Sequence, residues 1–158
     1  MEIDRCSVNN GTGIRCVLFV SGCSHHCVGC QNKDSWNYDA GKKFTNKQRD
    51  YILKYLESDI VDGITFSGGD PLEKENISCV VNLMKDIHNI FGNTKNIWVY
   101  TGYKYEDIDK SILKYIDVLV DGRFELDKRD ITLAFRGSSN QRIIDVQKSL
   151  KENKIILR

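Results

Sequence analysis

Short apolar runs alternate with longer amphipathic stretches along most of this chain, and the alternation limits the folds open to it. The runs cover residues 14–20, 63–67, 97–100 and 116–120. They are rich in β-branched residues, which is typical of buried strands. Between them, apolar residues recur at helical spacing over 46–57 and again over 77–91. Strands that alternate with helices indicate an α/β domain with a mainly parallel sheet.

Local signals place the ends of several elements. The Thr45 to Gln48 segment has the form of a capping box, which predicts that a helix begins there. Gly68 and Gly69 end the second strand and precede the second long helix. A third helix is expected over 105–115. Further short strands are expected over 131–135, 142–146 and 154–157.

The length of the chain limits how far such units can close into a barrel. A complete eight-unit barrel takes about 250 residues, whereas this chain has 158. We therefore expect a partial, laterally open (β/α) barrel of about four to six units. One domain is expected over 1–158, because Pro71 is the only proline and no linker composition occurs. Ligands should bind at the carboxyl ends of the strands.

Charge and composition exclude some classes of function. The net charge is +1, so the chain lacks the excess of basic residues that is typical of nucleic-acid-binding proteins. A mildly basic stretch over 123–142 has acidic residues interleaved and is interpreted as a solvated surface. Residues 1–15 match neither a secretion signal nor a membrane span, so a cytoplasmic location is expected. In a reducing compartment the six cysteines favour metal or redox chemistry over disulfides.

Three cysteines follow the first apolar run directly. Cys23, Cys27 and Cys30 have Cys-x3-Cys-x2-Cys spacing on what must be a loop. Thiolates are the usual ligands of iron-sulfur clusters, and a [4Fe-4S] cluster ligated only by protein takes four of them. Three cysteines therefore leave one iron open. An open iron could chelate the amino and carboxylate groups of S-adenosylmethionine beside a centre of low potential.

A zinc site is the main alternative for this loop. The three cysteines with His25 or His26 could form a Cys3His tetrahedron. The spacing favours the cluster, because both histidines lie inside the ligand loop. Cys16 and Cys79 fall within a predicted strand and helix, where free cysteines pack as small hydrophobic residues. Cys6 could be a fourth ligand, which would make a closed electron-transfer cluster.

A Gly-Gly-Asp-Pro turn follows one strand and helix later. Glycines at Gly68 and Gly69 let a ligand approach the backbone closely, and Asp70 could accept hydrogen bonds from an ammonium group. Alone, such a turn is more often only a turn. Its position after a three-cysteine loop makes it more informative.

With both motifs in this order, the chain resembles the radical S-adenosylmethionine enzymes. The closest resemblance is to the activating proteins of anaerobic ribonucleoside-triphosphate reductase, which are glycyl-radical activating enzymes, and it extends along nearly the whole chain. Matching segments are 10–15, 100–103, 120–124, 136–142 and the loop through Asn32 and Trp36. Gly29 stands where many radical enzymes have an aromatic residue. The reductase activators resemble this chain in having glycine there. Thr12 replaces a common proline.

The resemblance implies a function and a set of roles. The cysteine triplet would hold a [4Fe-4S] cluster, with Gly68, Gly69 and Asp70 at the methionine end of S-adenosylmethionine. Gly29, Cys30 and Gln31 would meet the adenosyl end. Reductive cleavage of the cofactor would give a 5′-deoxyadenosyl radical, which removes a hydrogen from a glycine in the large subunit of the reductase. The electron would come from a low-potential donor such as reduced flavodoxin.

Other functions and roles remain open at this point. The chain could activate a different glycyl-radical enzyme, or it could be a non-catalytic Cys3His zinc or iron-sulfur binding module. Trp98, Tyr100 and Tyr103 are expected to be core or pocket residues. The side chains of Arg136, Asn140 and Gln141 would either hold the partner or organise a carboxy-terminal loop.

Overall fold

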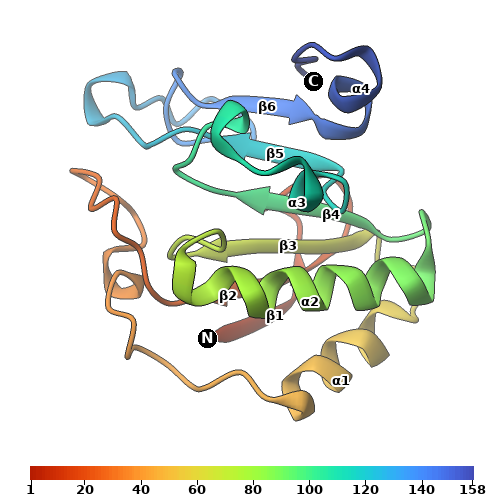
Figure 1. The fold of residues 1–158 in the computed structure, drawn as a ribbon. Helices are drawn as coiled ribbons and strands as arrows, with labels where there is room; N and C mark the ends of the chain where they lie inside the picture. Colours follow the sequence, from red (N-terminus) through yellow and green to blue (C-terminus); the bar gives the residue numbers. More distant parts are fainter.

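The computed structural model describes residues 1–158, and a six-stranded sheet forms its centre (Figure 1). The strands follow one another across the sheet in chain order. They are β1 (Glu2–Ser7), β2 (Arg15–Val20), β3 (Gly63–Gly68), β4 (Asn96–Tyr100), β5 (Val118–Asp121) and β6 (Arg142–Asp145). The pairings among β2, β3, β4 and β5 are parallel. Both edge strands, β1 and β6, pair antiparallel with their neighbours.

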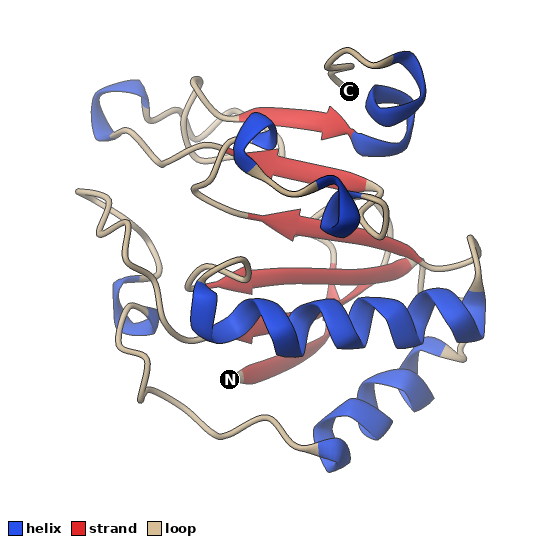
Figure 2. Cartoon of the chain, viewed as in Figure 1, coloured by secondary structure: helices blue, strands red, loops and turns tan.

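Three of the four helices lie between parallel strands in the chain, and the last follows β6. The four helices are α1 (Asn46–Leu56), α2 (Lys74–Phe91), α3 (Lys110–Leu113) and α4 (Val146–Glu152), with 3-10 turns at Lys33–Ser35, Tyr105–Asp107 and Leu126–Lys128. Figure 2 shows α1, α2 and α3 in front of the sheet. Helical crossovers on one face are the usual way to connect parallel strands.

The expected α/β class is confirmed, but the barrel is not. The sheet is mixed, and three strand-helix-strand units are present in place of the four to six that the sequence suggested. The two edge strands explain the difference. Residues 8–14 and 122–141 connect β1 to β2 and β5 to β6 without an α-helix, and such connections lead to antiparallel pairs.

Two of the three predicted helices are confirmed. α1 begins at the predicted capping box, where Gln48 Oε1 accepts the backbone N–H of Thr45 at 3.1 Å. The continuous helix predicted over 105–115 is wrong. Ile108 is extended between a 3-10 turn and α3, and Asp109 starts α3 afresh by accepting the N–H of Ser111 at 2.7 Å.

The strand predictions are confirmed for β2 to β6 with small shifts of their ends. The strand predicted over 131–135 is wrong, because Asp130 accepts hydrogen bonds from both the backbone and the hydroxyl of Thr132 and folds the chain into turns. Residues 154–157 form only an isolated bridge from Leu157 to Ile144. β1 and α4 were not predicted.

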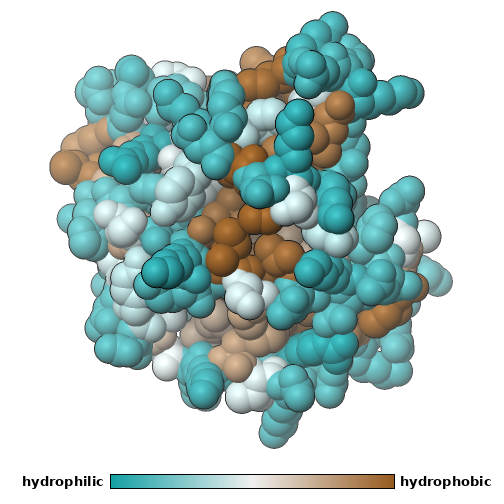
Figure 3. All heavy atoms as spheres, viewed as in Figure 1, coloured by the Kyte–Doolittle hydropathy of each residue, from teal (hydrophilic) through white to brown (hydrophobic).

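The hydrophobic core lies between the sheet and the helices. Alternate residues of β2 to β6 pack there against buried residues of all four helices. A smaller cluster of Trp98, Val118 and Val120, with Phe135 packed against it, occupies the other face of the sheet. Figure 3 shows an apolar patch among hydrophilic atoms on the helical side. No helix combines the length and the apolar character that crossing a membrane requires.

Candidate cofactor site

Both predicted motifs open onto one cavity at the carboxyl ends of the parallel strands. The cavity measures about 420 Å³, within the range of small-molecule sites. Among the residues lining it are Cys23, Cys27, Cys30, Gln31, Gly68, Gly69 and Asp70. Gly29 is not among the lining residues, and a Cβ there would come within 2.8 Å of Leu126 Cδ1. Its missing side chain makes room for Leu126.

The three cysteines of the loop are free thiols with different burial. Cys23 is 9% exposed, and Cys27 and Cys30 are half-buried. Burial raises the pKa of the Cys23 thiol to about 11 and also raises the pKa of Cys27. A cluster that takes these thiolates must therefore displace protons.

The remaining cysteines lie outside the cavity. Cys6 is exposed on β1, Cys16 is buried in β2 and Cys79 is half-buried on α2, and none of them lines the cavity. The donor set around the cavity is therefore three thiols. Three thiols fit a [4Fe-4S] cluster that keeps one iron for another ligand.

The histidines of the loop have partners other than the cysteines. His25 Nε2 lies 2.9 Å from Asp70 Oδ2, and the exposed His26 ring lies 4.8 Å from the Trp36 ring. No three His, Cys, Asp or Glu side chains converge on a position for one metal ion. Both rings therefore contact residues outside the cysteine triplet.

The Gly-Gly turn lets the end of β3 lie directly against the start of the cysteine loop. The Gly69 N–H donates to the Val20 carbonyl and the Asp70 N–H donates to the Gly22 carbonyl, both at 2.8 Å. A Cβ on Gly69 would come within 2.4 Å of the Gly22 oxygen. Gly68 has φ +99, which favours glycine. The turn therefore joins two loops as well as offering backbone to a ligand.

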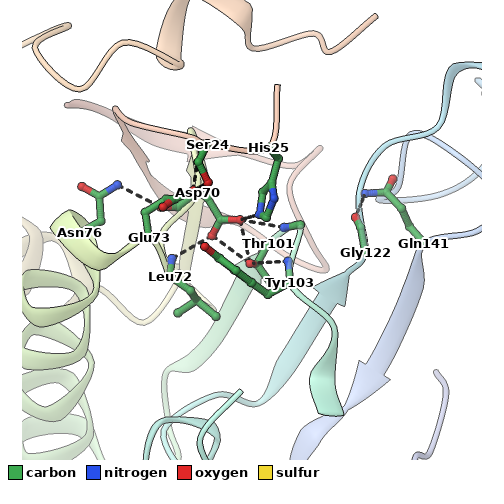
Figure 4. Close-up of polar contacts among 11 residues, drawn as sticks. Ser24, His25, Asp70, Leu72, Glu73, Asn76, Thr101, Tyr103, Gly122 and Gln141 are labelled. Carbon is green, nitrogen blue, oxygen red and sulfur yellow. Dashed lines mark hydrogen bonds and ion pairs between the residues drawn. The ribbon is translucent and has the colours of Figure 1, made fainter. Parts of the chain in front are cut away.

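Asp70 is the centre of the polar contacts at this site (Figure 4). The residue is 1% exposed. One carboxylate oxygen accepts the Leu72 N–H at 2.9 Å and the other accepts the Gly102 N–H at 2.8 Å. The Thr101 hydroxyl lies 2.9 Å from both oxygens, and His25 approaches the second. Protein donors thus already satisfy the carboxylate that the sequence suggested for an ammonium group.

A second anchor ties the cysteine loop to the start of α2. Glu73 Oε1 accepts the Ser24 N–H at 2.7 Å and its hydroxyl at 2.5 Å, and Asn76 Nδ2 donates to the Ser21 carbonyl at 2.9 Å. Burial raises the pKa of Glu73, but the hydrogen bonds from Ser24 and smaller contributions from Tyr38 and His25 together hold the pKa below its ordinary value. Sequence reasoning missed both anchors, because each joins residues far apart in the chain.

The opposite wall comes from the connection between β5 and β6. Arg123, Arg129 and Arg136 line the cavity there. Arg123 and Arg129 are exposed, so the basic stretch is solvated, as expected, and also forms a wall of the cavity. Gln141 organises this segment. Its Oε1 accepts the Gly137 N–H at 2.9 Å and its Nε2 donates to the Gly122 carbonyl at 3.0 Å. Of the two roles considered for Gln141, the structure favours organisation of the loop.

Aromatic residues occupy the positions expected of core and pocket residues. Tyr100 lines the cavity, and burial raises the pKa of its phenol. Trp98 is buried on the cavity side of the sheet, with the Phe135 ring against it at 5.5 Å. The Tyr103 ring packs edge-on against His25 at 4.6 Å.

Comparison with known proteins indicates an iron-sulfur domain. Residues 9–144 match the family model described as "4Fe-4S single cluster domain". This match includes all three cysteines of the loop and the Gly-Gly-Asp turn. The fold and the site therefore define an iron-sulfur protein with a single [4Fe-4S] cluster domain.

Curated relatives narrow this class. A protein of Pasteurella multocida is 45% identical over 139 residues, covering 84% of this chain and 87% of the relative. One from Escherichia coli is 43% identical, covering 84% and 88%, and one from Enterobacteria phage T4 is 42% identical, covering 90% and 93%. All three are named anaerobic ribonucleoside-triphosphate reductase-activating protein. The chain belongs to this family of activating proteins.

Proposed function

We propose that this chain is a radical S-adenosylmethionine enzyme that activates the anaerobic ribonucleoside-triphosphate reductase. Cys23, Cys27 and Cys30 would hold the [4Fe-4S] cluster, and S-adenosylmethionine would bind in the same cavity. One observation carries the proposal: three thiols and the Gly-Gly-Asp turn share a cavity that no fourth cysteine lines. The names of the relatives support the reductase, through its large subunit, as the protein substrate.

The cluster and S-adenosylmethionine would supply the chemistry, and the chain would position them. One electron from the reduced cluster would break the bond from sulfur to the ribose 5′ carbon, giving methionine and a 5′-deoxyadenosyl radical that takes a hydrogen from a glycine α-carbon. The cavity would hold the reactants in line and exclude other hydrogen donors. No residue has to act as an acid or a base.

The residues of the cavity divide between the two ends of the cofactor. Gly68 and Gly69 would offer their backbone to the methionine end, and the negative charge of Asp70 would favour the ammonium group nearby. Cys30 and Gln31 would face the adenosyl end. Gly29 would contribute there by keeping the loop close to Leu126, which its missing side chain permits.

Anaerobic reconstitution tests the first part of the proposal. After loading with iron and sulfide, the chain should convert S-adenosylmethionine to 5′-deoxyadenosine when a strong reductant is added. Replacing Cys23, Cys27 or Cys30 by Ala should abolish both the cluster absorbance and the product. Cys79→Ala, outside the cavity, should retain both. Tightly bound zinc without any cleavage product would contradict the enzymatic function.

A second experiment tests the protein substrate. Mixing the loaded chain and S-adenosylmethionine with the large reductase subunit should give a glycyl radical signal by electron paramagnetic resonance, with reduced flavodoxin as a candidate electron donor. Cofactor cleavage with a silent spectrum would indicate a different glycyl-radical partner.

A further inference from the structure

The side chain of His25 points inward from the middle of the cysteine loop. Its side chain is 3% exposed, although His26 and Val28 on the same loop are exposed. Nε2 lies 2.9 Å from Asp70 Oδ2, whereas Nδ1 is buried without a partner. Because a carboxylate only accepts, Nε2 is assigned the proton. Asp70 is therefore the one polar partner of this ring.

The end of β4 forms a slot that fits the ring. A Cβ on Gly102 would come within 2.3 Å of His25 Cδ2, so a side chain at this position would displace the imidazole. The Tyr103 ring closes the slot edge-on at 4.6 Å. Gly102 also donates its N–H to Asp70. Figure 4 shows His25 and the Thr101 to Tyr103 segment around the same carboxylate.

These contacts connect the two motifs of the site through one side chain. Cys23 and Cys27, on either side of His25, line the cavity together with Asp70. Ser24 already fixes the start of the loop to Glu73. His25 adds a link from the loop to the Gly68 to Asp70 turn itself. Losing this link would leave Asp70 buried with one donor fewer, and the loop free to shift relative to the turn.

We infer that His25 is a positioning residue, which sets the cluster at the distance from the Gly-Gly-Asp turn that S-adenosylmethionine requires. The inference rests on the proposed function. His25 lines the cavity beside Asp70, and in this role it acts by holding the cysteine loop against that carboxylate. Thr101 and Gly102 take part by orienting the carboxylate and leaving space for the ring.

The first test compares two neighbouring histidines in the full chain. Loaded His25→Ala should keep the iron and sulfide content of the unchanged chain. S-adenosylmethionine should still change the paramagnetic resonance spectrum of the reduced cluster in this variant. The same change should require about tenfold more cofactor than in the unchanged chain, as expected for a lost hydrogen bond to a charged group. His26→Ala should need no more cofactor than the unchanged chain. His25→Gln, whose amide can still donate to Asp70, should recover most of the affinity.

The second test uses the slot, and its single variant does not depend on His25→Ala holding a cluster. Gly102→Ala should displace the ring and weaken cofactor binding to a similar extent. In the double variant with His25→Ala, Gly102→Ala should cause no further loss of cofactor affinity, because the ring that the new Cβ would meet is absent. Full cofactor affinity in either single variant, or additive losses in the double variant, would overturn the inference.

Different results would contradict the proposed function and the positioning role of His25. If the unchanged chain binds a cluster but gives no spectral response to S-adenosylmethionine, the proposed function is wrong. If the unchanged chain responds and His25→Ala responds equally, only the positioning role is wrong.

Discussion

At the scale of single residues, Arg15 holds a charge inside the sheet without a carboxylate partner. Its guanidinium donates five hydrogen bonds, among them bonds at 2.7 Å to Thr65 Oγ1 and Asn96 Oδ1. It also lies over the Trp98 ring at 5.4 Å. Burial lowers its pKa to about 10, so the group stays charged at neutral pH.

Replacing this guanidinium should destabilise the fold strongly. Arg15→Met leaves buried acceptors without donors, and we expect the free energy of unfolding to fall by about 3 kcal/mol. Urea denaturation of the cluster-free chain would measure the loss. Arg5→Met, at an exposed position, is the control and should change stability by less than about 0.5 kcal/mol. Equal losses in the two variants would contradict this role for Arg15.

Thiol reactivity should separate two of the cysteines outside the cavity. Burial raises the pKa of Cys16 to about 12. The thiolate fraction at pH 8 is therefore on the order of one in ten thousand, and thiolates are the reactive form. In the folded chain iodoacetamide should modify the exposed Cys6 within minutes and leave Cys16 unmodified until urea unfolds the protein. Peptide mass spectrometry would detect early modification of Cys16, which would show that β2 opens.

At the scale of elements, the sequence predicts the strands and helices that carry a clear pattern of apolar residues within their own segment. β2 to β5, α1 and α2 carry continuous or periodic apolar residues, and the structure confirms them. β1 has mostly exposed residues, and its strand conformation depends on pairing with β2. Residues 131–135 are mostly apolar but follow the Asp130 turn, which local propensity does not reveal.

The same distinction applies to the site. The cysteine triplet and the Gly-Gly-Asp turn are each contiguous in sequence, and together they predicted residues that line one cavity. The contacts that orient them, such as those between His25 and Asp70 or between Ser24 and Glu73, join residues more than forty positions apart. No local pattern marks such pairs, so only the folded chain shows them.

The contact between the Gly-Gly turn and the cysteine loop gives an element-level prediction. Gly69 does not have a positive φ, so Gly69→Ala acts only through the contact with the Gly22 carbonyl. It should push the loops apart and lower the iron content of the reconstituted chain at least severalfold. Gly63→Ala meets the Asn96 carbonyl at the opposite end of β3. It should lower the melting temperature but keep the iron content at 10 °C, whereas equal iron loss would indicate general unfolding.

At the scale of the whole molecule, the two faces of the sheet are covered differently. The helices pack against one face. The other is covered in part by the connection of residues 122–141, which also forms one wall of the cavity. Segments without an α-helix depend on side-chain hydrogen bonds for their order. The stability of the cavity wall should therefore be separable from that of the sheet.

Gln141 offers a way to test this separation. Gln141→Ala removes the bonds to Gly122, Gly137 and Ser138, so amide exchange within 123–140 should become at least about tenfold faster. Amides of β3 and β4 should keep their protection, because they belong to the core between sheet and helices. Gln147→Ala removes bonds to the Ile116 and Lys114 carbonyls at the other end of β5 and should leave the wall unchanged. Hydrogen exchange with mass spectrometry resolves these segments, and faster exchange in the strands of Gln141→Ala would show that the wall and the sheet unfold as one unit.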